Sequence, residues 1–522
     1  MMPHLQGVDY LAIGLYFLLM AGIGLSSGRF VRDAGSYFKG GGTIPWAMAA
    51  ASNFMALFST FVFVAYAGIA YEHGLVAVTV YWTTVPACIV GALIFAARWR
   101  RTGHTTPTEY LEERYGLGLR QTVTWFGLVM RFLDNMVRLY AIGVFIAAAT
   151  PLSLGQSIIA SGLLFTALTL VGGVWSVVVM STVQCIILLL VCLILLPLSL
   201  GEAGGLGALS RAIPEHMTWF NGPKGELFWL FVFSYTVFIK FNENWAFIQR
   251  YFCVRDEAAA VKVGVVSGLL FLACTPIFMF PAVAARLILP DLPDPEMAYV
   301  ALSLKLLPAG VMGIMFSSML AATMSTVNAE YNVMAGVLIT DVYQRLINPA
   351  AAGERLLRLA RLASGLVGLV VIAGALSVRH LGGAFEANKL FTGILAIPLG
   401  VPLLLGLRLR RPDSLSASLT ILVGVIAGVV LNAAPWLSWE AATLVETLIC
   451  LAVYLVPPLF HRVGAARKAA VDAFVARIER PLTEAETPAV DPEAVRANAR
   501  LFAVALAVSG ALFVGMSLPS VR

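Results

Sequence analysis

Long apolar runs dominate this sequence and leave few folds open to it. About fourteen stretches reach the roughly 20 mostly apolar residues that a bilayer-spanning helix needs. They lie near residues 8–27, 45–71, 75–98, 118–150, 154–172, 175–200, 226–251, 259–289, 308–340, 357–378, 384–407, 414–433, 440–460 and 499–518. The chain is 59% hydrophobic and 12% charged, against about 45–50% and about 25% in soluble domains. We therefore predict an all-α membrane protein, which excludes a soluble enzyme, a disordered scaffold and a nucleic-acid binder.

The net charge of +6 comes from basic loops that follow alternate spans. These clusters are Arg29, Arg32 and Lys39; Arg98, Arg100 and Arg101; Arg250, Arg255 and Lys262; Arg345, Arg355, Arg358 and Arg361; and Arg408, Arg410 and Arg411. The loop Asp291–Glu296 between two of them is acidic. Because Lys and Arg accumulate in cytoplasmic loops, we predict a multi-pass protein of the plasma (cell inner) membrane. Both termini are then outside, and the amphipathic segment 461–498 lies in the cytoplasm.

Cysteine and histidine give no sign of a metal site or a catalytic centre. The six cysteines show no paired spacing and mostly fall within apolar runs, which is typical of small buried side chains. The six histidines fall in loops or at the ends of predicted helices, and no nucleophile–base set accompanies them. We therefore expect a protein that is not an enzyme.

Several spans carry charged side chains that a lipid-facing helix would not tolerate. Arg131, Asp134 and Arg138 are spaced three and four residues apart, which places them on one face of a helix. Lys240 and Glu243 lie in the span 226–251, and Glu330 lies in the span 308–340. Each such charge costs at least ~2.5–3.5 kcal/mol on insertion scales, so these side chains should face the interior of the bundle.

Five short motifs follow one another in an order that resembles the sodium:solute symporter family. They are Ser36-Tyr37-Phe38-Lys39-Gly40-Gly41 with Pro45-Trp46, Thr106 to Gly116, Gly172 to Val178 with Gln184, Gln249-Arg250-Tyr251, and Ala321 to Tyr343. The resemblance covers residues 8 to 410 and implies a leucine-transporter-like fold. Segments 45–200 and 226–410 would form two inverted five-helix repeats, with 8–27, 412–460 and 499–518 as additional helices. The first helix of each repeat would be broken near the midplane, where ion and solute bind.

The resemblance also implies a sodium site. Carried over onto this chain, its ligands would be the carbonyls of Met55, Phe58 and Ala322 and the hydroxyls of Ser325 and Thr326. The alternative is that both hydroxyls bond back to carbonyls four residues earlier, as Ser and Thr often do in membrane helices.

This chain departs from the family pattern at Ser181, where the family usually has an aspartate. The missing carboxylate puts a second sodium site in doubt. It also leaves open whether one sodium ion or another ion drives each cycle, with Ser181 as a candidate for gating or coupling.

For the solute site, the resemblance points to the helix turn before Leu139 and to the first core helix. Asp134 occupies the aligned pocket position, and Arg131 and Arg138 flank it by one turn. One of these arginines could bind a substrate carboxylate in a bidentate manner; alternatively, the three charges form an internal ladder that only links helices. Their one excess positive charge could be met by Glu330, by Glu243 or by a bound anion, which favours an anionic or zwitterionic solute.

Other polar residues complete the candidate set. Lys240 and Glu243 are candidates for pairing with each other or for gating or coupling. Glu330 is a further candidate for gating or coupling, and Asn244 is the better pocket candidate. Ser59, Thr60 and Phe61 match the solute-contacting stretch of the first core helix, but the apolar sequence from Phe61 to Phe63 disfavours a sugar. We expect the charges of the stretch 385–389 to lie at the membrane interface.

The sequence thus predicts a secondary active transporter in which sodium drives symport of a small organic solute, a carboxylate or a zwitterion, by alternating access. One alternative is a proton-coupled carrier of the same fold, in which Asp134 or Glu330 takes the ion's role. Another is a transporter-like membrane sensor, although segment 461–498 is too short for a signalling domain. The expected partners are the solute and the lipid bilayer; the oligomeric state is left open, and a monomer is compatible with the sequence.

Overall fold

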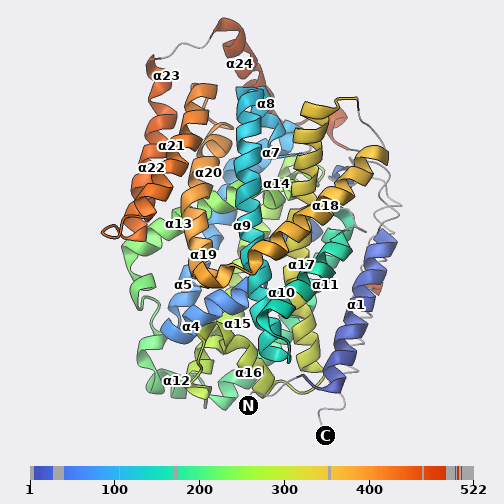
Figure 1. Ribbon diagram of the computed structural model, residues 1–522, viewed down its shortest axis with the longest axis vertical. Helices are drawn as coiled ribbons and strands as arrows, with labels where there is room; N and C mark the ends of the chain where they lie inside the picture. Colours follow the sequence, from blue (N-terminus) through green and yellow to red (C-terminus); the bar gives the residue numbers. More distant parts are fainter. Residues whose placement is uncertain are drawn as a thin grey trace.

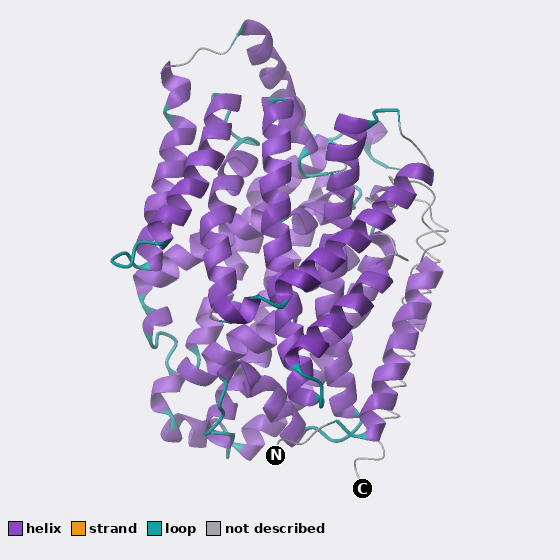
Figure 2. Ribbon diagram, viewed as in Figure 1, coloured by secondary structure: helices purple, strands orange, loops and turns teal. Residues whose placement is uncertain are grey.

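The computed structural model describes residues 5–27, 40–104, 106–169, 174–350, 354–381, 383–460 and 464–488, together with residues 500, 503, 504 and 507. All regular elements in this part of the chain are helical (Figure 2). The long helices run mostly along the long axis of the molecule and form one bundle (Figure 1).

The first half of the bundle contains α1 (Gly7–Ser27), α3 (Trp46–Leu57), the π-helical η3 (Val62–Tyr66), α4 (Ala67–His73), α5 (Val76–Trp82), α6 (Thr84–Gly91), η4 (Ala92–Ala96), α7 (Ala97–Thr102), α8 (Glu109–Tyr115), α9 (Leu117–Ala149), α10 (Leu154–Thr169), α11 (Val174–Glu202) and α12 (Leu206–Ala212). The second half contains α13 (Leu227–Glu243), α14 (Trp245–Phe252), α15 (Glu257–Ile288), η7 (Pro295–Met297), α16 (Ala298–Leu306), α17 (Val311–Val337), η8 (Leu338–Ile347), α18 (Glu354–Ala375), α19 (Ala384–Phe391), η10 (Thr392–Ala396), α20 (Ile397–Leu405), α21 (Ser414–Asn432), α22 (Trp439–Leu455), α23 (Pro457–Phe460) and α24 (Ala465–Glu479).

The prediction of an all-α membrane protein is confirmed. Nine continuous helical stretches among the described residues are long and apolar enough to cross a membrane, and α1 and α10 contain shorter apolar helices. Two further predicted spans, 45–71 and 226–251, are each divided by a break. The last predicted span, 499–518, lies almost wholly outside the described residues, as do most of the motif 36–41 and Gly172 and Gly173. The division into two inverted repeats stays a prediction.

The two breaks fall where the sequence places polar residues in the first core helix of each half. α3 ends at Leu57, and Phe58 then adopts extended backbone angles (φ −102°, ψ 117°). α13 ends at Glu243, and Asn244 is also extended (φ −66°, ψ 121°). The Asn244 side chain accepts a hydrogen bond from the Phe247 N–H at 2.9 Å, so it caps α14 and stabilises the interruption.

α17 forms the centre of the bundle and α21 and α22 its margin. α17 is buried along its whole length and contacts α1, α3, α9, α11 and α18. α21 and α22 pack on each other at the left edge of Figure 1 and expose apolar side chains such as Leu422, Ile426 and Leu448. These exposed side chains are suited to contact with lipid.

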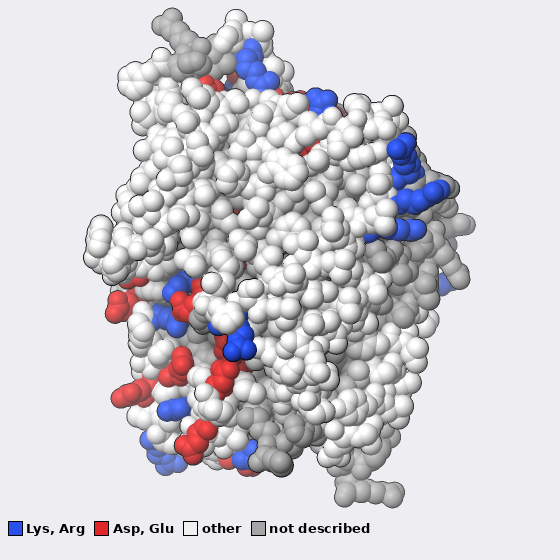
Figure 3. All heavy atoms as spheres, viewed as in Figure 1, with Lys and Arg blue, Asp and Glu red and all other residues white. Residues whose placement is uncertain are grey.

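The segment predicted as an amphipathic cytoplasmic helix contains α24. Its apolar face consists of Val471, Phe474, Val475 and Ile478, which are buried. α24 contacts α7 and α8, so this face packs on the protein. The upper end of the molecule in Figure 3 carries mainly Lys and Arg on the visible face, whereas most visible acidic side chains lie towards the lower end.

The first helix supplies the N-terminal cap of α17. Asp9 is 2% exposed, and its Oδ1 accepts hydrogen bonds from the Gly310 N–H at 2.7 Å and the Gly313 N–H at 2.8 Å. The residue at the N-cap of α17, Gly310, has no side chain with which to cap the helix itself. A carboxylate at this position also interacts favourably with the positive end of the helix dipole.

We expect Asp9→Ala to lower the free energy of unfolding by about 1–2 kcal/mol, because it leaves two buried N–H groups without an acceptor. Thermal unfolding of the purified protein in detergent would measure this loss. Tyr10→Ala is the matched control, since Tyr10 is half exposed on the same helix. Equal melting temperatures for the two variants would show that α17 does not depend on this cap.

Candidate functional site

The break after α3 places several oxygen atoms around the Thr326 side chain. The Thr326 Oγ1 lies 2.8 Å from the Met55 carbonyl oxygen, 3.2 Å from that of Phe58 and 3.0 Å from that of Ala322. Among the described residues, no backbone N–H outside the regular helices donates to the Met55 or Phe58 carbonyl. A hydroxyl carries one proton and can donate to one of these carbonyls at a time. The group is therefore rich in acceptors, as a site for a hard cation is.

The structure brings four of the five predicted sodium ligands together and places the fifth beside them. Thr326 makes the back-bond to Ala322 that the alternative interpretation requires, but it also reaches two carbonyls of another helix. Ser325 instead makes a close hydroxyl–hydroxyl contact with Ser181 on α11. Ser181 donates to the Val177 carbonyl at 2.6 Å. The residue that replaces the family's aspartate thus adjoins the predicted ion site.

Six charged side chains form a second cluster between α9, α13 and α17. The Arg131 Nη2 lies 2.6 Å from each carboxylate oxygen of Glu243. The Arg131 Nη1 is 4.0 Å from Glu330 Oε1, and the Arg138 Nη1 is 3.8 Å from the same oxygen. The Arg138 Nη2 is 3.3 Å from Asp134 Oδ2. These contacts tie together groups that the bilayer would otherwise leave unsolvated.

Two expectations about this cluster are wrong. Lys240 does not pair with Glu243: its Nζ donates to Asp134 Oδ1 at 2.9 Å, because Lys240 projects towards α9 and α19 while Glu243 meets Arg131. The internal ladder also takes another form, since Arg131 binds Glu243 and not Asp134. Three cations and three anions therefore meet: the α9 residues leave one positive charge in excess, Lys240 adds a second, and Glu243 and Glu330 balance both.

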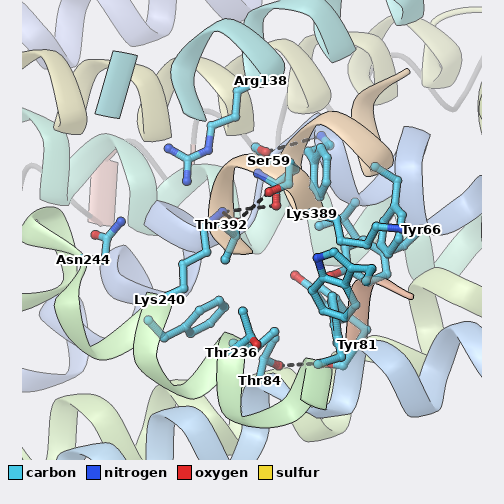
Figure 4. A pocket seen from close by; sticks show the side chains of 18 residues that line it. Ser59, Tyr66, Tyr81, Thr84, Arg138, Thr236, Lys240, Asn244, Lys389 and Thr392 are labelled. Atoms are coloured by element: carbon cyan, nitrogen blue, oxygen red, sulfur yellow. Dashed lines mark hydrogen bonds between the residues drawn. The ribbon is translucent and has the colours of Figure 1, made fainter. Parts of the chain in front are cut away.

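A cavity lies beside this cluster, lined by both broken helices and by α9, α19 and α22 (Figure 4). Its free space is about 70 Å³, against about 30 Å³ for one water molecule in the liquid. The wall is aromatic and polar at once: Phe61, Phe233 and Phe385 line it together with hydroxyl, amide and ammonium groups. Such a lining suits a small organic molecule held by a few polar contacts.

Four of the predicted solute residues line this cavity: Ser59, Phe61, Arg138 and Asn244. The other three do not. Thr60 instead faces α17, where its Oγ1 donates to the Met319 carbonyl at 2.7 Å and its N–H donates to Thr323 Oγ1 at 3.0 Å. Arg131 and Asp134 are fully buried behind the wall, and Asp134 is linked to the cavity through Lys240, Arg138 and Asn388.

The structure adds cavity residues that the sequence patterns did not single out. They are Tyr66, Tyr81, Thr84, Thr236, Thr392 and Trp439. Lys240 donates to Asn388 Oδ1 at 3.1 Å and to Thr392 Oγ1 at 2.8 Å, so α19 and η10 join the charge cluster. The stretch 385–389, whose charges we expect at the membrane interface, also contributes Phe385, Asn388 and Lys389 to the cavity lining. The polar spacing Asn388–Thr392, one helical turn, was the available signal.

A contact outside the spanning segments, between Glu296 and the start of α19, contains a titratable group. Glu296, in η7, accepts a hydrogen bond from the Ala384 N–H at 3.1 Å, at the start of α19. Burial, reinforced by the charge of Asp294 and opposed by the α19 N–H groups, raises the pKa of the Glu296 carboxyl to about 7. This contact joins the loop after α15 to the helix that carries Asn388 and Lys389.

Comparisons with known proteins show which family this chain belongs to. Residues 37–428 match the Sodium:solute symporter family. The chain is 23% identical to a sodium/glucose cotransporter of Vibrio parahaemolyticus over 81% of this chain and 84% of the relative. It is 23% identical to the sodium/sialic acid symporter NanT of Aliivibrio fischeri over 87% of this chain and 93% of that relative. It is 27% identical to sodium/myo-inositol cotransporter 2 of Sus scrofa over 82% and 70%.

Solved structures show the same fold. A Na⁺-coupled sialic acid symporter in a substrate-bound outward-open state superposes with a TM-score of 0.79 at 17% identity, covering 87% of this chain and 98% of that one. Mhp1, a nucleobase-cation-symport-1 family transporter in a closed conformation, superposes with a TM-score of 0.55 at 16% identity, covering 84% and 98%.

The two arginines of α9 should respond differently to substitution. Arg131→Gln leaves the buried Glu243 carboxylate without its partner, so we expect a loss of about 3–5 kcal/mol of stability. Arg138→Gln leaves Asp134 paired with Lys240, so we expect near-normal melting and about ten-fold weaker solute binding. Thermal unfolding and solute titration of the purified variants would measure both.

The double variant Arg131→Gln/Glu243→Gln is the control for this comparison, because it removes the charge and its partner together. It should recover much of the stability that Arg131→Gln loses. Equal destabilisation by Arg131→Gln and Arg138→Gln, with unchanged solute affinity in the latter, would contradict a role for Arg138 in solute binding.

Glu296 should make the stability of the protein depend on pH. Its folded-state pKa of about 7 lies above the ordinary value of 4.5, so the folded protein retains a proton that the unfolded chain releases. This contribution to stability is complete below about pH 4.5 and falls as the pH rises to about 7. Melting curves from pH 4 to 8 should show less of this decline in Glu296→Gln, and Asp291→Asn, at an exposed acid of the same loop, should behave as wild type.

Proposed function

The chain belongs to the sodium:solute symporter family and is a sodium-coupled solute transporter, and from this premise we propose that it carries a small carboxylate or zwitterion by alternating access. The relatives named above transport, by their names, glucose, sialic acid and myo-inositol, so family membership alone does not select the solute. The charges around the cavity favour this class of solute.

The observation that carries the sodium part of the proposal is the convergence of carbonyl oxygens on Thr326. We assign the ion to the carbonyls of Met55, Phe58 and Ala322 and to the hydroxyls of Thr326 and Ser325. Neutral oxygens of this kind replace the hydration shell of a hard cation without adding a buried negative charge. Because Ser181 brings a hydroxyl where relatives have a carboxylate, we assign one sodium ion to each transport cycle.

Within this class of solutes, the charge balance of the cluster favours a zwitterion over a simple carboxylate anion. Among the described residues, the buried Arg138 Nη1 has no hydrogen-bond acceptor and the buried Glu330 Oε2 has no donor. A solute carboxylate could accept a hydrogen bond from Arg138 Nη1. A solute ammonium could lie on the side of Glu330, which is linked to the cavity wall by the hydrogen bond from Asn244 Nδ2 to Glu330 Oε1 at 3.0 Å. The aromatic side chains would surround the apolar body of such a molecule.

Alternating access would use the groups that link the helices around the cavity. We propose that segments 45–200 and 226–410 act as the two inverted repeats, with 8–27, 412–460, 461–498 and 499–518 outside them. Ser181, Lys240, Glu243 and Glu330 would take gating or coupling roles, since each joins two helices in the cluster or at the ion site. Their contacts must be exchanged for others when the helices move.

Sodium should stabilise the purified protein through Thr326 and drive uptake in proteoliposomes. We expect Thr326→Val and Ser325→Ala each to weaken the sodium-dependent rise in melting temperature, with about ten-fold weaker apparent sodium affinity. A site occupied at 100 times its Kd stabilises by about 2.7 kcal/mol, so even a millimolar site is measurable. Potassium and choline salts give the reference.

Ser317→Ala is the matched control, because Ser317 on the same helix only bonds back to the Gly313 carbonyl at 2.7 Å. It should leave the sodium response intact. Uptake that follows a pH gradient without sodium and is lost in Asp134→Asn would instead establish proton coupling. For the solute, stabilisation in sodium by amino acids or carboxylates is expected, and stabilisation by glucose or myo-inositol alone would overturn the assignment of class.

A further inference from the structure

A second cavity lies far from the solute site, between α8, α21, α23 and α24. Its volume is about 850 Å³, which is in the range of ligand sites. It lies towards the upper end of the view in Figure 1, where α21 begins and α22 ends. The orientation predicted from the basic loops places this end in the cytoplasm.

Basic side chains outnumber acidic ones in its lining. The five basic residues are Arg114, Arg410, Arg411, Arg467 and Lys468, and the two acidic ones are Asp413 and Asp472. Asp413 already caps α21, where its Oδ1 accepts from the Ser416 N–H at 2.9 Å. Asp472 lies 3.9 Å from Arg410. The two carboxylates can offset at most two of the five positive charges.

Arg114 builds the floor of this cavity. It is 1% exposed, and its guanidinium donates to the carbonyls of Gly406, Leu409, Arg410 and Pro412 at 2.7–3.3 Å. No carboxylate of the described residues lies within 4.0 Å of it. The charge of Arg114 is therefore fixed in place at the base of the cavity by backbone carbonyls and not by an ion pair of the described residues.

Three basic side chains at the rim also lack a partner. Among the described residues, Arg411 and Lys468 form no side-chain hydrogen bond or ion pair, and the buried Arg467 Nη2 has no acceptor. Burial and the charge of Arg114 lower the pKa of Arg467. α24 also begins here, and no side chain caps its N-terminus at Gly464. Uncapped N–H groups and guanidinium groups together favour a phosphate.

The cavity is continuous with the apolar surface of α21 and α22. Leu415 and Leu459 line it and are 51% and 61% exposed, and Phe460 beside them is 83% exposed. Farther along α21, Leu422 and Ile426 are also exposed. A phosphate held at the basic end would therefore have apolar surface below it for acyl chains, which a free phosphate ion would not use.

We propose that this cavity binds the phosphate headgroup of an anionic phospholipid, with Arg411, Arg467 and Lys468 contacting the headgroup and its acyl chains lying along α21 and α22. The lipid would bridge α24, which packs on α7 and α8, to the peripheral pair α21 and α22. Anionic lipids of the cytoplasmic leaflet are attracted to basic clusters of this kind.

The test uses the full-length protein in detergent, titrated with phosphatidylglycerol, phosphatidylcholine or inorganic phosphate while its melting temperature is followed. Phosphatidylglycerol should stabilise the wild type with the lowest half-saturating concentration. The triple variant Arg411→Gln/Arg467→Gln/Lys468→Gln should raise that concentration at least ten-fold. Native mass spectrometry should show one fewer retained anionic lipid in the variant.

The matched control is Arg255→Gln/Arg355→Gln/Arg361→Gln, which removes three exposed basic residues at the same predicted side of the membrane. It should bind phosphatidylglycerol as the wild type does. Asp472→Asn should bind more tightly, a gain that misfolding cannot produce. Equal loss in both triple variants, equal stabilisation by phosphatidylcholine, or inorganic phosphate matching the lipid would each overturn the proposal.

Discussion

The need to satisfy backbone polar groups inside a bilayer shapes the centre of this protein. A continuous helix meets that need by itself, whereas a broken one leaves carbonyl and N–H groups that other parts of the molecule must bind. At Phe58 the freed carbonyls meet Thr326 of α17, and at Asn244 a side chain caps the second half of the helix. Both breaks therefore depend on neighbouring polar groups, and both lie beside the cavity.

The charge cluster depends on the same breaks. Glu243 is the last residue of α13, and the interruption that follows it lets its carboxylate meet Arg131 while Asn244 binds Glu330. Six charges that would each be unfavourable in lipid are thereby combined into a group with no net charge. A solute, an ion or a proton that enters this group must replace one of its contacts, which gives the cluster a physical means of linking binding to helix movement.

The margin of the molecule follows a different rule. α21 and α22 expose apolar side chains, and basic side chains collect near Arg410 and Arg411, where α21 begins. Glu296 holds a comparable place at the opposite side, where a loop meets the start of α19. Both regions lie outside the predicted ion and solute sites, and each joins elements that are distant in the chain.

Periodicity and composition were sufficient to predict the spans, because a bilayer demands about 20 apolar residues for each. The polar stretches near Ser59 and Asn244 marked where two helices break, and the stretch near Thr326 marked the predicted ion site. Pairing was not predictable: Lys240 and Glu243 stand one turn apart, but each reaches a different helix, Asp134 and Arg131 on α9. The roles of Thr60, Asn388 and Lys389 were equally hidden, since a sequence pattern shows which face a residue shares within its own helix. Which neighbour that face meets is set by the packing of helices distant in the chain, and this the tertiary structure alone decided.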